Sequence, residues 1–235
     1  MQTLLMQTRT GSSTQGGFSL FELLVAMAIT IVLLGLATAI LASSFNVRTR
    51  ENLKSDALAD AQRGLNLMTR EIANAGYALT DNGIVPGDSG LNSIRVRANL
   101  NAAAGETTSN AAIDRDEDVK YLLFTESNNS YIVRLDVNTS AQEMILANRV
   151  DALNIRYYAD KVYYTTDACD TTDVQDAAGN PVSEVTQKSS ARYIVISVCV
   201  TLPAVGAPNS AGYQPPSRVQ LVSDVALRNA DLVNY

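Results

Sequence analysis

The sequence contains no histidine and no tryptophan among its 235 residues, and it has only two cysteines. Without histidine the chain lacks the commonest general base and the commonest metal-binding imidazole, which excludes Ser-His-Asp and Cys-His catalytic arrangements. Two cysteines are too few for a four-cysteine zinc site, and no Walker-type phosphate loop is present. We therefore expect a protein that is not an enzyme and that holds no metal or other cofactor.

Long basic runs are absent as well. The chain has 24 Asp and Glu residues against 18 Lys and Arg residues, and its isoelectric point is near 4.7. A protein that binds nucleic acid through phosphate contacts needs a concentrated positive surface. We therefore expect no nucleic-acid binding by this chain alone. The length allows one globular domain besides a membrane anchor.

One long segment lacks charge altogether. Residues 23–45 are uncharged, and most of them are Leu, Ile, Val, Ala and Met. As an α-helix this segment would be about 35 Å long, which is enough to cross a lipid bilayer. Before it stand Phe18 and a solitary acid, Glu22, after a polar stretch that ends in Gly17. A secretory signal peptide has the reverse order, with its small-residue cleavage site after the apolar run.

The N-terminal sequence resembles the prepilin processing motif. Residues 17–27 read GFSLFELLVAM, and type IV pilins and type II secretion pseudopilins are cut between such a Gly and the following Phe. The resemblance implies that residues 1–17 are a leader removed by prepilin peptidase on the cytoplasmic side. Gly17 would then be the last leader residue, and Phe18 would become an N-methylated N-terminus.

The resemblance also gives Glu22 a role in assembly. A carboxylate at the edge of the hydrocarbon costs about a few kcal/mol unless a cation neutralises it, and cleavage creates such a cation, the Phe18 amine. Glu22 of one subunit would pair with the Phe18 amine of its neighbour and so fix the axial offset between subunits. The alternative is that Glu22 lies at headgroup level as an ordinary helix N-terminal acid, which the helix dipole stabilises.

The charges that flank the apolar segment, taken by themselves, predict that the head lies in the cytoplasm. The leader has Arg9 as its one basic residue, whereas Arg48, Arg50 and Lys54 follow the segment, so the positive-inside rule would leave the rest of the chain in the cytoplasm. That rule is weak for long translocated domains. On the motif and the cysteine pair we expect a single-pass protein in the bacterial inner membrane with its head in the periplasm.

Beyond the uncharged segment, apolar residues recur at three- and four-residue steps, which predicts an amphipathic continuation of the helix. These positions are Leu53, Ala57, Leu58, Ala61, Leu65, Met68, Ile72 and Ala75. The charged residues between them predict a solvated face: Arg50, Glu51, Lys54, Asp56, Asp60, Arg63, Arg70 and Glu71. We expect one helix over residues 18–75, with about 18–45 in the membrane and a stop near Gly76.

Residues 76–235 have the pattern of strands separated by polar turns. Alternating, β-branched and aromatic stretches predict strands at 93–98, 119–125, 131–137, 152–158, 192–202 and 218–227. We therefore expect an α+β fold, in which a long N-terminal helix packs on an antiparallel β-sheet head with long loops. By resemblance this is a pilin-like fold.

The head resembles that of PilW-type minor pilins in residues 118–124, 129–134 and 150–158, and residues 225–229 are similar to an ending shared with J-type pseudopilins. The resemblance implies a minor pilin that helps initiate type IV pilus assembly and stays near the pilus tip. Its partners would be other minor pilins, the major pilin, prepilin peptidase, an inner-membrane assembly platform and membrane lipid. The alternatives are a type II secretion J-type pseudopilin, and a tip adhesin or DNA-uptake module on the same anchor.

Cys169 and Cys199 are compatible with one disulfide, which would tether a loop to the sheet and would require an oxidising compartment. The alternative is a buried free thiol at Cys199 with Cys169 unpaired.

Two acidic clusters allow a calcium interpretation, but neither fits an EF-hand loop, and we expect solvated acidic turns. The clusters are Asp114, Asp116, Glu117 and Asp118, and Asp167, Asp170, Asp173 and Asp176.

The pairs at Tyr157, Tyr158, Tyr163 and Tyr164 predict sheet packing, with one tyrosine of each pair inward and the other outward.

Overall fold

The computed structural model describes residues 17–101, 112, 114–127, 129–139, 142–148 and 150–230. Its first element is helix α1, Leu20–Ala73, whose 54 residues make a rod about 80 Å long at the usual rise per residue. The sequence predicted this helix within two residues at each end. The chain leaves it through Asn74 and then turns at Gly76, where φ is +77°. Glycine suits that turn because a Cβ there would lie 2.7 Å from the Asp81 carbonyl oxygen.

Nine strands follow, in three antiparallel sheets among the described residues. Strands β1 to β4 form a four-stranded sheet in chain order, β5, β8 and β9 form a three-stranded sheet in that order, and β6 pairs with β7. The strands are β1 Ser93–Arg97, β2 Asp118–Glu126, β3 Asn129–Asp136, β4 Gln142–Asn148, β5 Val150–Tyr158, β6 Tyr163–Asp167, β7 Asp170–Gln175, β8 Tyr193–Leu202 and β9 Ser217–Ala226. Short 3-10 turns occupy Pro86–Asp88, Val137–Thr139 and Lys188–Ser190.

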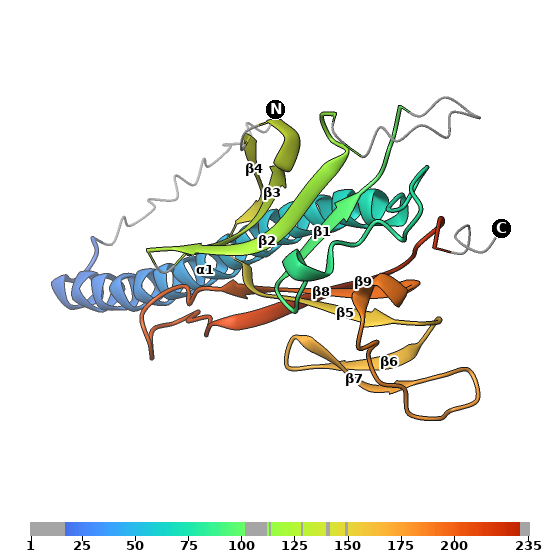
Figure 1. Cartoon of the computed structure of the whole chain (residues 1–235). Helices are drawn as coiled ribbons and strands as arrows, with labels where there is room; N and C mark the ends of the chain where they lie inside the picture. Colours follow the sequence, from blue (N-terminus) through green and yellow to red (C-terminus); the bar gives the residue numbers. More distant parts are fainter. Residues whose placement is uncertain are drawn as a thin grey trace, which may run out of the picture.

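The C-terminal part of α1 lies between the two larger sheets (Figure 1). It contacts β4 of the first sheet and β8 and β9 of the second, while β5 contacts β1, β2 and β3 on the far side of the core. The segment before β1 also ties the sheets together. The amide of Ile155 in β5 donates to the Leu91 carbonyl at 2.8 Å, and the amide of Leu123 in β2 donates to the Asn92 carbonyl at 3.0 Å. The α+β architecture predicted from the sequence is therefore confirmed.

The main core fills the space between the helix and the two sheets. From α1 it takes the buried stripe Ala61, Leu65, Met68 and Ile72, which is the later part of the predicted apolar face. From the sheets it takes alternate residues, including Ile94, Tyr121, Ile132, Leu153, Ile155, Ile194, Ile196 and Val198. Gly64 lets β4 approach the helix closely, since a Cβ there would lie 3.3 Å from the Leu146 Cβ.

The β6–β7 hairpin covers the outer face of the three-stranded sheet and makes a second, smaller core (Figure 1). Tyr158, Val162, Tyr193 and Val195 are buried there. The prediction for the first tyrosine pair was therefore wrong. Tyr157 does face the main core, but Tyr158 on the opposite face is also buried, because the hairpin covers that side. In the second pair Tyr163 is exposed and Tyr164 half-buried, as predicted.

Six strands were predicted close to their observed bounds, and three were missed. The missed strands are β4, β6 and β7. Strands β6 and β7 are rich in Thr and Asp and largely exposed, so they lack the alternation that marks a half-buried strand. The head accordingly contains three sheets where the sequence indicated one.

Candidate functional site

The N-terminal segment presents the residues of the processing motif to solvent. Gly17, Phe18 and Ser19 precede the helix in non-helical conformation, and Phe18 is 84% exposed. The helix starts at Leu20, and the amide of Leu23 donates to the Ser19 carbonyl at 3.1 Å. Glu22 therefore lies in the first helical turn, exposed, where a negative charge is favoured by the helix dipole.

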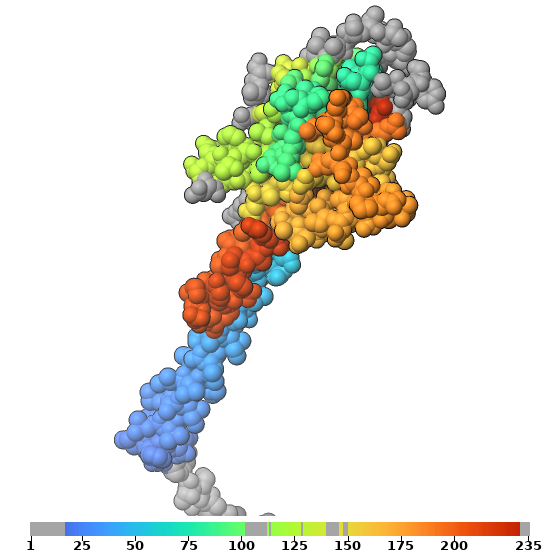
Figure 2. Space-filling model, turned by 60° about the horizontal axis from the view of Figure 1, so that its bottom comes forward, coloured from blue at the N-terminus to red at the C-terminus, as the bar shows by residue number. Residues whose placement is uncertain are grey.

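The part of α1 that follows is apolar on all sides and is not covered by the head. Residues 20–42, hereafter the exposed half of α1, are all exposed. An 18-residue window in this helix has a mean hydropathy of 2.7 and no buried residue, so within the described residues α1 alone has the length and composition to cross a membrane. Such a surface needs lipid or other apolar helices around it. Figure 2 shows this half projecting, in blue, away from the head.

The rest of α1, residues 43–73, is hereafter the covered half, and two polar clusters fix it to the head. The first is built on Arg50, whose guanidinium donates to the carbonyl oxygens of Pro203 and Pro215 and to the Ser217 hydroxyl. Only 7% of Arg50 is exposed. A buried guanidinium is tolerated because these acceptors replace water.

The second cluster joins the last turns of α1 to the four-stranded sheet. Glu71 accepts hydrogen bonds from Arg134, both at 3.1 Å, and from the Tyr121 hydroxyl. Arg134 also donates to Asp116 at 2.7 Å. Burial, and next the nearby Glu71 carboxylate, raise the pKa of Tyr121, so its hydroxyl stays a donor.

These clusters overturn part of the predicted solvated face. Arg50 is buried and Glu71 is half-buried in an ion pair, although both were expected in water. Glu51, Lys54, Asp56, Arg63 and Arg70 are exposed as predicted.

The first acidic cluster is also structural. Glu117 is 3% exposed and accepts the amides of Leu100 at 2.8 Å and Asp114 at 3.0 Å. Asp118 is 5% exposed and accepts two hydrogen bonds from Arg95, each 2.7 Å long. The expectation of a solvated turn was wrong for these two residues, because backbone amides bind the Glu117 carboxylate and Arg95 binds that of Asp118. Asp114 and Asp116 are exposed as expected.

The second acidic cluster is closer to the expectation. Asp167 and Asp173 are exposed, and Asp176 accepts the amides of Ala178 and Asn180 within its own turn. Asp170 is the exception, because it pairs with Arg156. Among the residues that the structure describes, no group of three or more His, Cys, Asp or Glu is arranged to hold a metal ion.

The two cysteines are joined in a disulfide. Cys169 lies in the turn between β6 and β7, Cys199 lies in β8, and their Cα atoms are 5.6 Å apart. The Cys169 carbonyl accepts hydrogen bonds from the Ser197 hydroxyl at 2.7 Å and from the side-chain Nδ2 of Asn154 at 3.0 Å. The bond therefore ties the tip of the β6–β7 hairpin to the central strand of the three-stranded sheet.

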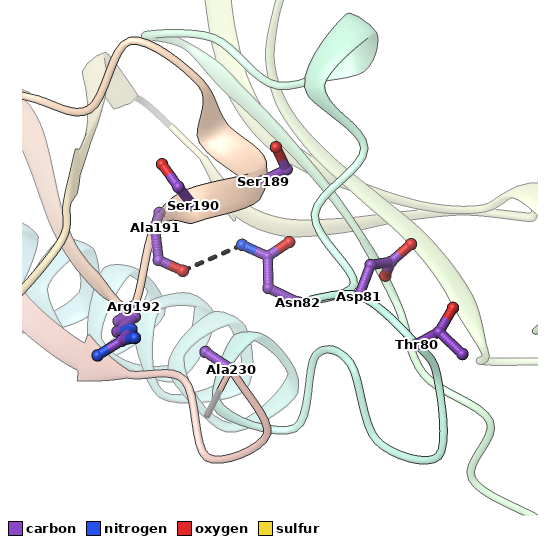
Figure 3. Close-up of a pocket in the computed structure, with 8 residues that line it drawn as sticks. All are labelled: Thr80, Asp81, Asn82, Ser189, Ser190, Ala191, Arg192 and Ala230. Atoms are coloured by element: carbon purple, nitrogen blue, oxygen red, sulfur yellow. Dashed lines mark hydrogen bonds between the residues drawn. The ribbon is translucent and has the colours of Figure 1, made fainter. Parts of the chain in front are cut away.

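A polar pocket of about 250 Å³ lies beyond the end of the helix (Figure 3). Its walls come from residues 80–82, 189–192 and Ala230. The Asn82 side chain crosses it and donates to the carbonyls of Lys188 and Ala191, both at 3.0 Å, while its oxygen accepts the Ile84 amide. These polar groups are used to hold the turn after α1 against the segment before β8.

Comparison with known proteins gives two findings. Residues 12–38 match the family described as the prokaryotic N-terminal methylation motif. Among solved structures, the fold is similar to that of the type IV-like pilin TTHA1219 from Thermus thermophilus, with 9% sequence identity, a TM-score of 0.40, and coverage of 73% of this chain and 96% of that one. A search of curated proteins gave no match.

The motif match confirms the prepilin-type motif predicted at residues 17–27. The chain thus combines that motif with an exposed apolar helix and an antiparallel head.

Proposed function

We propose that the chain is a minor pilin that helps to initiate type IV pilus assembly and remains near the pilus tip. In this proposal prepilin peptidase removes residues 1–17 at the Gly17–Phe18 bond, and Phe18 becomes the N-methylated N-terminus. The protein then waits in the bacterial inner membrane as a single-pass subunit with its head in the periplasm. An assembly platform in the membrane supplies the work that moves it into the pilus at the cell surface.

The observation that carries the proposal is the exposed half of α1 together with its one acid. Glu22 is the sole charged residue between residues 18 and 47, and the head covers none of residues 20–42. In an apolar medium its carboxylate favours any nearby cation strongly. The Phe18 amine of a neighbouring subunit is that cation, so their pairing sets the offset at which the apolar helices of this chain, other minor pilins and the major pilin associate.

The processing step is tested by intact-mass and N-terminal analysis of protein extracted from membranes. We expect an N-terminus at Phe18 with an added methyl group. A Gly17→Leu variant is the matched control, since a bulky residue before the cut should leave the leader in place. A wild-type N-terminus at Met1 in a strain that assembles pili normally would contradict the proposal.

The pairing step is tested by Glu22→Val. We expect this variant to be processed and membrane-bound yet absent from sheared pili. Glu51→Val removes an exposed acid from the same helix beyond the apolar segment, and it should still be incorporated. Equal incorporation of both variants would rule out the pairing mechanism.

Deletion of the gene distinguishes the proposed function from the two alternative functions. Loss of surface pili supports the minor pilin. Loss of exoprotein release with pili intact would assign the chain as a J-type pseudopilin, and intact pili that no longer adhere or take up DNA would assign it as a tip binding module.

A further inference from the structure

The loop between β8 and β9, residues 203–216, leaves the head and follows α1 toward the membrane-spanning part. In Figure 2 it is the red segment that extends along the blue helix, below the rest of the head. It contacts the helix at three levels. Arg50 binds the carbonyls at its two ends, Asn46 lies 3.5 Å from the Ala211 carbonyl, and Gly212 lies against Ser43.

The contact with Ser43 requires glycine at position 212. Its φ is +75°, and a Cβ there would lie 2.4 Å from the Ser43 Cα. The loop is also braced internally, because Val205 and Gln214 exchange two backbone hydrogen bonds of 2.9 Å. The loop is therefore a folded element with a fixed position along the helix.

That position coincides with the end of a membrane span. Ser43 is the first residue of α1 that the head covers. A bilayer hydrocarbon layer of about 30 Å corresponds to roughly 20 helical residues, so a layer that begins beside Glu22 ends near Ser43. The loop would thus lie where hydrocarbon gives way to headgroups.

Its composition suits that depth. Residues 203–217 contain no charged residue, and residues 203–216 hold four of the chain's six prolines, which have no amide hydrogen to leave unpaired. Tyr213 is the aromatic residue of the loop and is half-buried, and tyrosine is enriched at membrane interfaces. Arg48 on the helix and Arg218 just after the loop are both exposed, and at this depth they would lie near the headgroup phosphates. Arg218 also lies 3.7 Å from a carboxylate oxygen of Asp151.

We propose that residues 203–216 rest on the outer leaflet of the inner membrane and seat the head at a fixed height on the bilayer. The inference rests on the membrane-anchored state of the proposed function. Because the loop is bound to both Ser43 and Arg50, contact with lipid also limits tilting of the head relative to the helix.

The absence of tryptophan allows a direct test. The full chain carrying Tyr213→Trp is reconstituted in vesicles of phosphatidylcholine and phosphatidylglycerol, with bromine on the acyl chains either near the headgroup or near the bilayer centre. We expect the emission to shift to the blue and to be quenched by the shallow bromines. Ala207→Trp, at an exposed position of the same loop, gives a second reading if Tyr213→Trp fails to fold.

Two controls separate this proposal from the anchor itself. Leu33→Trp in the exposed half of α1 should be quenched by the deep bromines, and Tyr163→Trp on the head hairpin by neither. If Leu33→Trp is quenched while both loop variants behave like Tyr163→Trp, the loop proposal is overturned and the anchor stands. If Leu33→Trp also escapes quenching, the anchored state and this inference both fail. Loop variants that shift to the blue only when other pilin subunits are added would assign the loop to a subunit contact instead, and would also overturn the proposal.

Discussion

The two halves of α1 are one continuous helix in two different surroundings. Residues 20–42 expose apolar side chains on every face, whereas residues 43–73 bury one stripe and hold two polar clusters against the head. The exposed half contains one charged residue, Glu22, and the covered half contains many. The free energy of folding of the head therefore depends on the covered half, while the exposed half is free to serve association with lipid or other helices.

The two halves also differ in whether their charged side chains find partners within the chain. Arg50 and Glu71 have protein partners within this chain. Glu22 lies in the first turn of the helix, ahead of a segment without charge. Buried polar groups with partners contribute to stability, whereas a charge facing an apolar medium favours a partner outside the chain.

The largest difference in stability between substitutions in the two halves should come from a pair of methionines. Met68 is fully buried in the main core, whereas Met27 is 55% exposed. We expect Met68→Ala to lower the free energy of unfolding of the head by roughly 3 kcal/mol, because it leaves a cavity. Met27→Ala should leave it unchanged. Near-UV circular dichroism of the tyrosines in detergent follows the unfolding, and similar losses in both variants would contradict the division of the helix.

A second comparison uses two glutamates, one in each half of the helix. Glu71→Gln removes the charge that Arg134 faces, and Arg134 has a side chain only 8% exposed. We expect the head to lose about 2 kcal/mol of stability, as for other hydrogen bonds to charged groups. Glu22→Gln should leave the unfolding midpoint of the head unchanged and affect assembly alone. A loss of assembly in a fully folded Glu71→Gln protein would show that the covered half also takes part in subunit contacts.

A third comparison uses two arginines that lie two residues apart in the first turns of the covered half. Arg50→Met removes the hydrogen bonds to the β8–β9 loop and should cost about 1.5 kcal/mol. Arg48 is exposed, and Arg48→Met should have no measurable effect on stability. Limited proteolysis within residues 203–216 gives an independent measure, since the loop of the Arg50 variant should be cut faster. Equal rates of cleavage in the two variants would mean that Arg50 does not hold the loop.

Much of this fold could be predicted from local pattern. The helix follows from an uncharged run and a three-to-four residue repeat, and six strands follow from alternation of β-branched and aromatic residues. What failed depends on long-range contacts. Arg50 is bonded to a residue 153 positions away and Glu71 to one 63 positions away, so each looked like an ordinary member of the solvated face.

The same cause explains the errors at the surface of the head. Tyr158 is buried because the disulfide-tied hairpin covers it, and the sequence of that hairpin, rich in Thr and Asp, indicates turns rather than strands. Glu117 and Asp118 can be buried because backbone amides and Arg95, which come from other segments, donate hydrogen bonds to their carboxylates. At the N-terminus, by contrast, Gly17, Phe18 and Glu22 are close together in the chain, and a local motif is enough to identify them.

The smallest expected effect separates the halves by acid titration. Hydrogen bonds from Lys120 and then Arg95 hold the pKa of Asp88 below its usual value. At Asp170 burial raises the pKa, but the hydrogen bonds from Arg156 and from the Thr171 amide, together with the charge of Arg156, outweigh burial and lower the pKa. A carboxylate with a lowered pKa in the folded state stabilises the fold above the pKa of the unfolded chain, about 3.9, and this contribution is lost as the pH falls toward the folded pKa.

Each of these partly exposed pairs should contribute less than about 1 kcal/mol. We expect the unfolding temperature of the head to fall as the pH is lowered from about 5 to about 3, and Asp88→Asn to reduce that slope. Residues 23–42 of the exposed half contain no ionisable side chain, so the helical signal of this stretch should stay constant over the same range, and a parallel loss of that signal would contradict the independence of the two halves.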